Sequence, residues 1–399
     1  MRAFNRGQVD EVTLDSAKIR TRMMMGRGEP GRVLVAVMAE TRAWEITAQG
    51  LFENVLDPLG ADLALCVGDH EDPNPLYERA KFIWRADEPE DWGELYDRKA
   101  DGPAWRMLLE PGAQLLGPIE PEVGSGAIVQ YYRQFLKESI KRAGIADDYD
   151  WLIVTRSDLL WPIPHPSTRY LSNLHLYALD GEGYGGVGDR HLIVPRRYVT
   201  RFLEVPDPIF SQPETLKRRL GRISVAQDWP VLNPERYLAA RLKDLGLARR
   251  VRFLPYAPFA VRAPEGSTRW SPGVFDEELG AYIKYPTELE RSRIAQRFVS
   301  GQESWARYLA PLRGARLRRQ LRVAYRERGL YERPFPPSAV HLRVGRRLRH
   351  SRQKQRQRLH RAIVRLGPGL RRIPFMPALL DARIRRIRRR AERRTAGRS

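Results

Sequence analysis

The residues best suited to chemistry follow a buried apolar run near the middle of the chain. Residues 151–154 (WLIV) are continuously apolar, and directly after them come Thr155, Arg156, Ser157 and Asp158. Such a run, preceded by a helical segment, is typical of a central strand of an α/β sheet, and ligands bind outside the carboxyl ends of these strands. A cation and a carboxylate two residues apart could hold an anion and a metal ion together. A nucleotide-sugar diphosphate requires such a site, since its charge must be neutralised before the sugar–phosphate bond breaks. The alternative is a surface ion pair at a strand end.

The N-terminal third of the chain supplies elements that could position this strand. Residues 32–39 (RVLVAVMA) predict a buried strand, a helical pattern follows over 43–57, and 61–67 (ADLALCV) predict a second strand. This is a strand–helix–strand unit of the doubly wound kind. Its first turn contains neither GxGxxG nor GxxxxGK[ST], which disfavours a dinucleotide-binding or P-loop function.

Beyond this unit, residues 68–125 show weak periodicity and read as a long excursion with short elements, of the length that often lines a site. The glycine-rich turn 181–188 (GEGYGGVG) could contact a phosphate, although such clusters are more often flexible loops. Helices are predicted over 126–143, 195–204 and 233–247, and strands over 191–194, 250–263 and 281–286, the last at an edge of the body.

Charge separates a basic C-terminal tail from the rest of the chain. Residues 301–399 contain 30 basic and 5 acidic side chains, a net of +25, whereas the other 300 residues contain 40 basic and 43 acidic ones. We therefore expect a mobile N-terminal arm at 1–31, a near-neutral body at 32–300 and a basic, partly helical tail at 301–399. The many arginines can also reflect genomic base composition.

The single cysteine, Cys66, lies in an apolar run and reads as a core residue. It cannot form an intrachain disulfide, which favours a reducing compartment. The N-terminus has no apolar signal region, and no stretch reaches 18 consecutive apolar residues. The sequence thus predicts a cytoplasmic protein, or one attached at the inner face of the membrane. No HExxH-like spacing or GxSxG elbow points to a histidine metal site or a serine nucleophile.

Four phrases, in order, resemble a group of bacterial glycosyltransferase-A-like proteins associated with capsular and lipopolysaccharide synthesis. They are RVLVAVMAETRAWEITAQGLFENVLDPLGADLAL, IVQYYRQFLKESIKRAGIADDYDWLIVTRSDL, GDRHLIVPRRYV and NPERYLAARL. The resemblance covers roughly residues 32–290. It implies an α/β, glycosyltransferase-A-like fold, a Rossmann-like mixed sheet flanked by helices. It also implies transfer of a sugar from a nucleotide-diphosphate sugar, often with Mn²⁺ or Mg²⁺.

The resemblance also implies roles for residues that bind the donor. The family's metal motif, Asp-any-Asp, is here Arg156-Ser157-Asp158, with only one carboxylate. Asp158 would contact the metal or the ribose, while Arg156 could neutralise phosphate through a bidentate contact. Arg42 would face the nucleotide, and Asp189 with Arg190 could orient the donor sugar or its phosphate. Each has a structural alternative as a surface residue or local ion pair.

An inverting reaction needs a carboxylate to accept the proton of the acceptor hydroxyl, and Asp228 and Glu235 are the candidates. Glu235 lies in the first turn of its predicted helix, where it could simply complement the helix dipole. With one metal-motif carboxylate, a noncatalytic scaffold with a sugar-nucleotide fold remains the alternative to an enzyme.

The basic tail has its own interpretations. Leu380, Ile384, Ile387 and Ala391 recur at helical spacing among arginines, which is typical of a basic amphipathic helix on an anionic membrane. That would suit a lipid-linked glycan acceptor. Nonspecific binding to nucleic acid is less favoured because aromatic residues for base stacking are scarce. A solvated tail is the third possibility.

Overall fold

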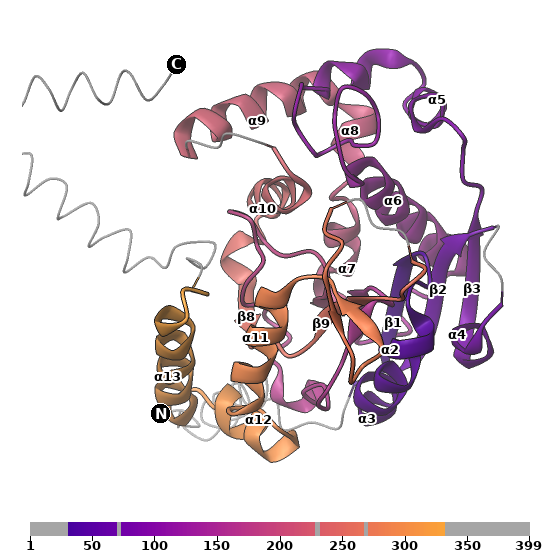
Figure 1. Cartoon of the computed structure of the whole chain (residues 1–399). Helices are drawn as coiled ribbons and strands as arrows, with labels where there is room; N and C mark the ends of the chain where they lie inside the picture. The colour runs from indigo at the N-terminus through magenta and orange to yellow at the C-terminus, as the bar shows by residue number, and fades with distance from the viewer. Residues whose placement is uncertain (1–30, 70–72, 228–231, 267–269, 332–399) are drawn as a thin grey trace, which may run out of the picture. The chain divides into compact units, whose positions relative to one another are not determined.

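The computed structural model describes residues 31–69, 73–227, 232–266 and 270–331 (Figure 1). The predicted N-terminal arm, except for its last residue, and the tail beyond residue 331 lie outside this part of the chain. The three interpretations of the tail therefore stay predictions.

A seven-stranded mixed sheet forms the centre of the body, in the order β3-β2-β1-β4-β7-β6-β8. β1, β2, β3 and β4 are parallel, β7 runs antiparallel to both of its neighbours, and β6 and β8 resume the first direction. The strands are β1 Val33–Ala39, β2 Asp62–Gly68, β3 Ala80–Ala86, β4 Trp151–Thr155, β6 Leu176–Leu179, β7 Leu192–Pro195 and β8 Val251–Leu254.

Hydrophobic layers cover both faces of this sheet because side chains alternate along each strand. In β1, Leu34 and Ala36 face the layer that contains α6 (Gly126–Ala143), whereas Val33, Val35 and Val37 face the opposite layer. That second layer contains α2 (Trp44–Leu51), the π-helical turn η1 (Phe52–Leu56) and α3 (Asp57–Leu59). The predicted α/β class, a mixed sheet flanked by helices, is confirmed.

Local signals account for several of these helices. The predicted helix over 43–57 forms as the run from α2 to α3, and it ends at Gly60, which has φ +54°. α10 (Pro234–Asp244) begins as expected, because the side chain of Asn233 accepts from the backbone N–H of Arg236 at 2.8 Å. The remaining helices before it are α4 Pro75–Arg79, α5 Trp92–Lys99, the 3₁₀ helices η2 Pro103–Leu108 and η3 Thr168–Tyr170, α7 Arg196–Leu203, α8 Asp207–Ser211 and α9 Pro213–Gln227.

A second, four-stranded sheet has the order β10-β11-β9-β5. Its strands are β5 Leu159–Leu160, β9 Phe259–Arg262, β10 Val274–Asp276 and β11 Ala281–Ile283. The single strand predicted over 250–263 is wrong: prolines at 255 and 258 divide it into β8 and β9, which join different sheets. The predicted edge strand over 281–286 is also corrected, since β11 pairs on both sides.

The body extends past the boundary predicted at residue 300. The 3₁₀ turn η4 (Ala248–Arg250) and α11 (Pro286–Gln296) are followed by α12 (Gln302–Leu309) and α13 (Arg313–Glu327). Trp305, Leu321 and Tyr325 on the last two helices are buried in the second hydrophobic layer. The start of the basic region therefore belongs to the core. None of the helices in the described residues is long and apolar enough to cross a membrane.

Candidate functional site

The strand order singles out one edge of the main sheet as the candidate ligand site. The run β3-β2-β1-β4 is a doubly wound order in which the sheet changes its direction of growth between β1 and β4. Ligands bind at such a switch point, outside the carboxyl ends of the strands. At this edge β1 is followed by Glu40, Thr41 and Arg42, and β4 is followed by the segment 156–158.

The reversed strand β7 brings further predicted residues to this edge. Because β7 is antiparallel to β4, with Leu192 opposite Val154, its amino end lies where β4 ends. Asp189 and Arg190 immediately precede that end. α10 leads into β8, which runs in the same direction as β4, so the start of α10 with Glu235 approaches the same edge. Asp228 lies outside the described residues.

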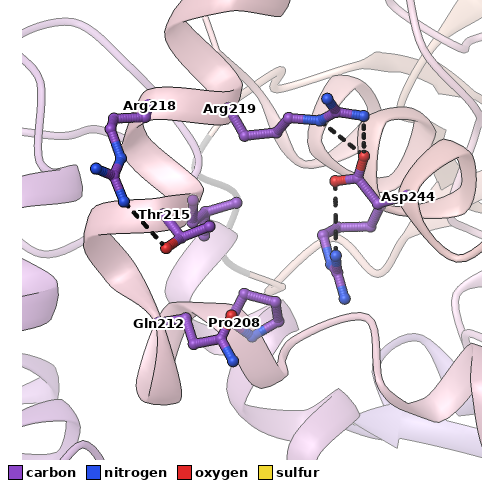
Figure 2. Close-up of a pocket in the computed structure, with 8 residues that line it drawn as sticks. Pro208, Gln212, Thr215, Arg218, Arg219 and Asp244 are labelled. Atoms are coloured by element: carbon purple, nitrogen blue, oxygen red, sulfur yellow. Dashed lines mark hydrogen bonds and ion pairs between the residues drawn. The ribbon is translucent and has the colours of Figure 1, made fainter.

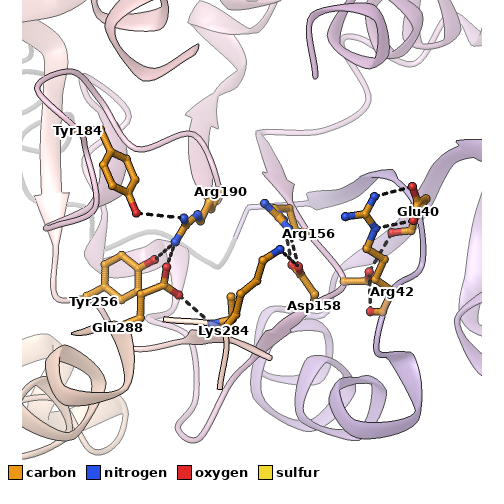
Figure 3. A network of polar contacts seen from close by, with 11 residues as sticks. Glu40, Arg42, Arg156, Asp158, Tyr184, Arg190, Tyr256, Lys284 and Glu288 are labelled. Atoms are coloured by element: carbon orange, nitrogen blue, oxygen red, sulfur yellow. Dashed lines mark hydrogen bonds and ion pairs between the residues drawn. The ribbon is translucent and has the colours of Figure 1, made fainter. Parts of the chain in front are cut away.

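Arg156 and Asp158 form a close pair in the segment after β4, at the switch point (Figure 3). Nε of Arg156 donates to Oδ1 of Asp158 at 2.8 Å, and Nη2 donates to Oδ2. Nζ of Lys284, which follows β11, lies 4.0 Å from the same Oδ2. Burial alone would raise the pKa of Asp158, but the charges of Arg156 and Lys284 outweigh it and hold that pKa below its usual value.

A second ion pair stands beside the first. Nη2 of Arg42 donates to Oε1 of Glu40 at 2.5 Å, and both side chains are about one-third exposed. The hydroxyl of Ser157 lies 2.9 Å from the carbonyl oxygen of Glu40 and 3.0 Å from that of Arg42, so it can donate to either. Ser157 therefore ties the turn after β1 to the turn after β4.

Arg190 lies on the other side of Lys284, paired with the buried Glu288 (Figure 3). Its Nη1 also donates to the hydroxyl of Tyr256 at 3.3 Å, and its guanidinium stacks 4.6 Å from the ring centroid of Tyr285. Oε2 of Glu288 accepts from the backbone N–H of Ala260 at 2.8 Å, which fixes the carboxylate. Arg190 is thus held in place from several directions.

Lys284 is the functional candidate that sequence reasoning missed. Burial lowers the pKa of its ammonium to about 8, and the positive charges of Arg156, Arg42 and Arg190 act in the same direction against the attraction of Asp158. Lys284 is thus a buried cation that shares its nearest carboxylate with Arg156, an arrangement that favours binding of an anion. A lone lysine at the end of the apolar segment AYI was the only signal in the sequence.

The predicted carboxylates Asp189 and Glu235 also meet. Asp189 accepts from Nη2 of the buried Arg133 on α6 at 2.9 Å. Burial, with the negative charge of Asp189, raises the pKa of Glu235 to about 8, against the attraction of Arg190 and Arg133. A carboxyl group with this pKa can exchange a proton near neutral pH.

The surroundings of Asp158 do not fit a divalent cation. Both of its oxygens accept from Arg156, and Lys284 presents a second positive charge to the same carboxylate. Magnesium and manganese prefer several oxygen ligands. Within the residues the structure describes, no group of three histidine, cysteine, aspartate or glutamate side chains could hold a metal ion.

A buried pair of histidines contacts the last residue of β4, Thr155. Nε2 of His165 lies 3.2 Å from Nε2 of His191, and Nδ1 of His191 lies 3.0 Å from Oγ1 of Thr155. Nδ1 of His165 lies 2.9 Å from the carbonyl oxygen of Pro166 and must donate to it. Burial lowers the pKa of both rings, and when both are neutral His191 donates to His165 and accepts from Thr155.

A separate cavity of about 450 Å³ lies beside α8, α9 and α10 (Figure 2). Arg218, Arg219 and Arg241 line it together with Asp244, which pairs with Arg219 at 2.5 Å and with Arg241 at 3.6 Å. The pair of Arg219 and Asp244 links α9 to α10, whereas Arg241 and Asp244 both lie on α10. None of the predicted site residues lines this cavity.

No protein-family model and no curated protein matches the sequence. Among solved structures, the apo form of mouse xyloside xylosyltransferase 1 is similar over 57% of this chain and 85% of that chain, with a TM-score of 0.32 and 9% identity. Assignment of a function therefore depends on the chain's own residues.

Proposed function

We propose that the chain is a glycosyltransferase that transfers a sugar from a nucleotide-diphosphate sugar to a glycan or lipid-linked acceptor. One observation carries the proposal: Arg42, Arg156 and Lys284 lie together at the switch point of the sheet, and the buried Lys284 shares its nearest carboxylate with Arg156. Ligands with phosphate groups bind at this place in doubly wound sheets.

In the proposed reaction, the bond between the anomeric carbon and the diphosphate oxygen breaks, and the acceptor oxygen bonds to that carbon. The leaving nucleoside diphosphate gains one negative charge. Arg156 and Lys284 would stabilise that charge, because fixed cations at a partly buried site lower the energy of the transition state in which it develops. Arg156 is suited to a bidentate contact with phosphate.

The acceptor hydroxyl must lose its proton in this step. Glu235 is the proposed general base, and its raised pKa makes it a stronger base than an ordinary carboxylate. The positive charge of Arg190 acts to lower the pKa of both Lys284 and Glu235, so Arg190 is near both groups. The transferred sugar would therefore lie beside Arg190.

The proposed donor site works through protein cations. Asp158, predicted as a metal ligand, would instead orient Arg156 and Lys284. When the diphosphate binds, it would replace some of their contacts with Asp158. The prediction that the acceptor is a cell-surface polysaccharide at the inner membrane face rests on the family resemblance, and attachment through residues 301–399 stays a prediction.

The test is the melting temperature of the whole chain with a panel of nucleoside diphosphates and nucleotide sugars. A ligand that binds the folded state raises that temperature in proportion to the logarithm of its concentration over its dissociation constant. We expect a shift selective for one base that Arg156→Ala and Lys284→Ala reduce. Without any shift across the panel, the donor site is wrong. Binding without sugar transfer or donor hydrolysis would favour the noncatalytic scaffold.

A further inference from the structure

The glycine-rich loop between β6 and β7 contains two strained residues that are not glycine. Glu182 has φ +51° and Tyr184 has φ +45°. A bulky side chain rarely adopts this left-handed conformation, because its Cβ approaches the carbonyl oxygen too closely. Such strain persists only where surrounding contacts impose it, and it concentrates at functional sites.

Contacts from two helices impose the strain on this loop. The carbonyl oxygen of Tyr184 accepts from Nε of Arg236 at 2.9 Å and from Nδ2 of Asn233 at 3.3 Å, both at the start of α10. The buried Glu182 pairs with Nη1 of Arg291 on α11 at 2.7 Å. The loop is therefore fixed to α10 and α11 at once.

The glycines serve this close packing. A Cβ on Gly186 would lie 2.1 Å from the carbonyl oxygen of Glu235, so only glycine allows the loop to approach the start of α10. The N–H of Val187 donates to the same carbonyl oxygen at 3.1 Å. The loop thereby holds Tyr184 next to the helix turn that carries Glu235.

The ring of Tyr184 nevertheless stays 40% exposed at the proposed site. The centroid of its ring lies 5.9 Å from the guanidinium carbon of Arg190, and Nη2 of Arg190 donates to its hydroxyl at 3.5 Å (Figure 3). That hydroxyl in turn donates to Oε2 of Glu182 at 2.7 Å. Glycine or asparagine is the usual residue at a loop position with this backbone conformation, and neither has an aromatic ring. A tyrosine that is both strained and half exposed indicates a ligand that needs the ring.

We propose that Tyr184 is the surface on which the transferred sugar ring stacks. The inference rests on the proposed function, which puts that sugar beside Arg190, between the cations that hold the diphosphate and the carboxyl group of Glu235. The C–H groups on one face of a pyranose ring carry partial positive charge, and the face of an aromatic ring is negative. Tyrosine also offers a rigid surface, and aromatic residues commonly line ligand sites.

Two substitutions separate the ring from the strain. Tyr184→Asn removes the ring and introduces a residue that tolerates the left-handed conformation. Tyr184→Phe keeps the ring and removes the hydroxyl, which donates to Glu182 and accepts the longer bond from Arg190. Each full-length variant is titrated with the nucleoside diphosphate selected by the panel above and with the matching nucleotide sugar, and its melting temperature is measured without ligand.

For Tyr184→Asn we expect an unchanged or higher melting temperature, unchanged affinity for the nucleoside diphosphate, and about tenfold weaker binding of the nucleotide sugar. Tyr184→Phe should bind both ligands as the parent does. Equal affinity of Tyr184→Asn and the parent for the nucleotide sugar would overturn the stacking role while leaving the donor site intact. A lower melting temperature with equal weakening of both ligands would show a purely structural tyrosine. Failure of every nucleotide to bind the parent would overturn the donor site itself.

Discussion

Nζ of Lys284 lies 4.0 Å from Oδ2 of Asp158, although more than 120 residues separate the two in the sequence. The lysine follows β11 of the small sheet, and the aspartate follows β4 of the main sheet. The contact depends on β9, which pairs with β11 on one side and with β5, directly after Asp158, on the other. A cation therefore reaches the switch point from a part of the chain far removed in sequence.

Replacing Lys284 by alanine should weaken binding of the nucleoside diphosphate by about 10- to 100-fold, since a charged hydrogen bond contributes roughly 1.5–3 kcal/mol. The matched control is Lys81→Ala. Lys81 pairs with Asp62 at 2.6 Å at the amino ends of β2 and β3, on the opposite edge of the sheet. Titration calorimetry measures both. Equal effects of the two substitutions would contradict a specific role for Lys284.

Chelation of divalent cations should leave donor binding unchanged, because Asp158 is bound to Arg156 and Lys284. The measurement compares nucleotide affinity with EDTA and with added Mn²⁺. An increase of tenfold or more with Mn²⁺ that Asp158→Asn abolishes would show that the predicted metal site forms after all.

Glu235→Gln should abolish sugar transfer and leave donor binding intact. It should also stabilise the protein above neutral pH. The folded-state pKa of about 8 exceeds the ordinary value of 4.5, so the folded protein holds this proton more tightly and loses stability as pH rises from 4.5 through 8. Glutamine has no proton to lose. Melting temperatures at pH 6 and pH 9 should therefore diverge between parent and variant, and parallel curves would refute the shifted pKa.

The parent enzyme's transfer rate at low substrate concentration should rise with pH towards a plateau above pH 8, since the base acts only when deprotonated. A rate that is flat from pH 6 to pH 9 would remove Glu235 from the role of base. Asp228, the other carboxylate predicted as the base, lies outside the described residues and is tested in parallel by Asp228→Asn. Loss of transfer in that variant alone would assign the role to Asp228.

Acid should destabilise the body through His165. Burial lowers its pKa from 6.5 to about 4, so the unfolded chain binds the proton more readily and stability falls as pH decreases from 6.5 to 4. The shift corresponds to about 3 kcal/mol at the lower end. Urea midpoints of the parent and of His165→Gln measure this. The same acid loss in both would contradict it, and His175→Gln controls for the other histidine with a pKa near 4.

A chain that ends after residue 331 should fold, whereas one that ends after residue 300 should not. The shorter chain lacks Trp305, Leu321 and Tyr325, which are almost completely buried. Removal of one large core side chain costs about 2–5 kcal/mol, and total stability is roughly 5–15 kcal/mol. Cooperative thermal unfolding of the shorter chain would show that α12 and α13 are dispensable.

The sequence predicted the strands that are apolar throughout and the helices with clear ends. β1, β2, β4 and β7 lie within a residue or two of their predicted positions, and α6 matches its predicted range of 126–143. β3 was missed because, as an edge strand, it alternates partly exposed and exposed residues such as Lys81 and Arg85 and so lacks an apolar run.

The site divides in the same way. Residues directly after or before predicted strands, such as Arg42, Arg156 and Arg190, could be assigned to one edge from the sequence. Lys284 and Glu288 could not, because their approach to that edge depends on how the small sheet pairs. The pairing of Asp158 with Arg156 and Lys284, on which the proposal of a donor site without a metal rests, also required the three-dimensional arrangement.

A connection of only three residues joins the main sheet to the small sheet, since β4 ends at Thr155 and β5 begins at Leu159. The carbonyl oxygen of Asp158 accepts from the N–H of Val261 in β9 at 2.9 Å, so the aspartate is attached to the small sheet by its backbone as well. An anion that competes for Arg156 and Lys284 thus acts on the joint between the sheets. Binding of such an anion would therefore alter contacts at the connection that holds the small sheet to the main sheet.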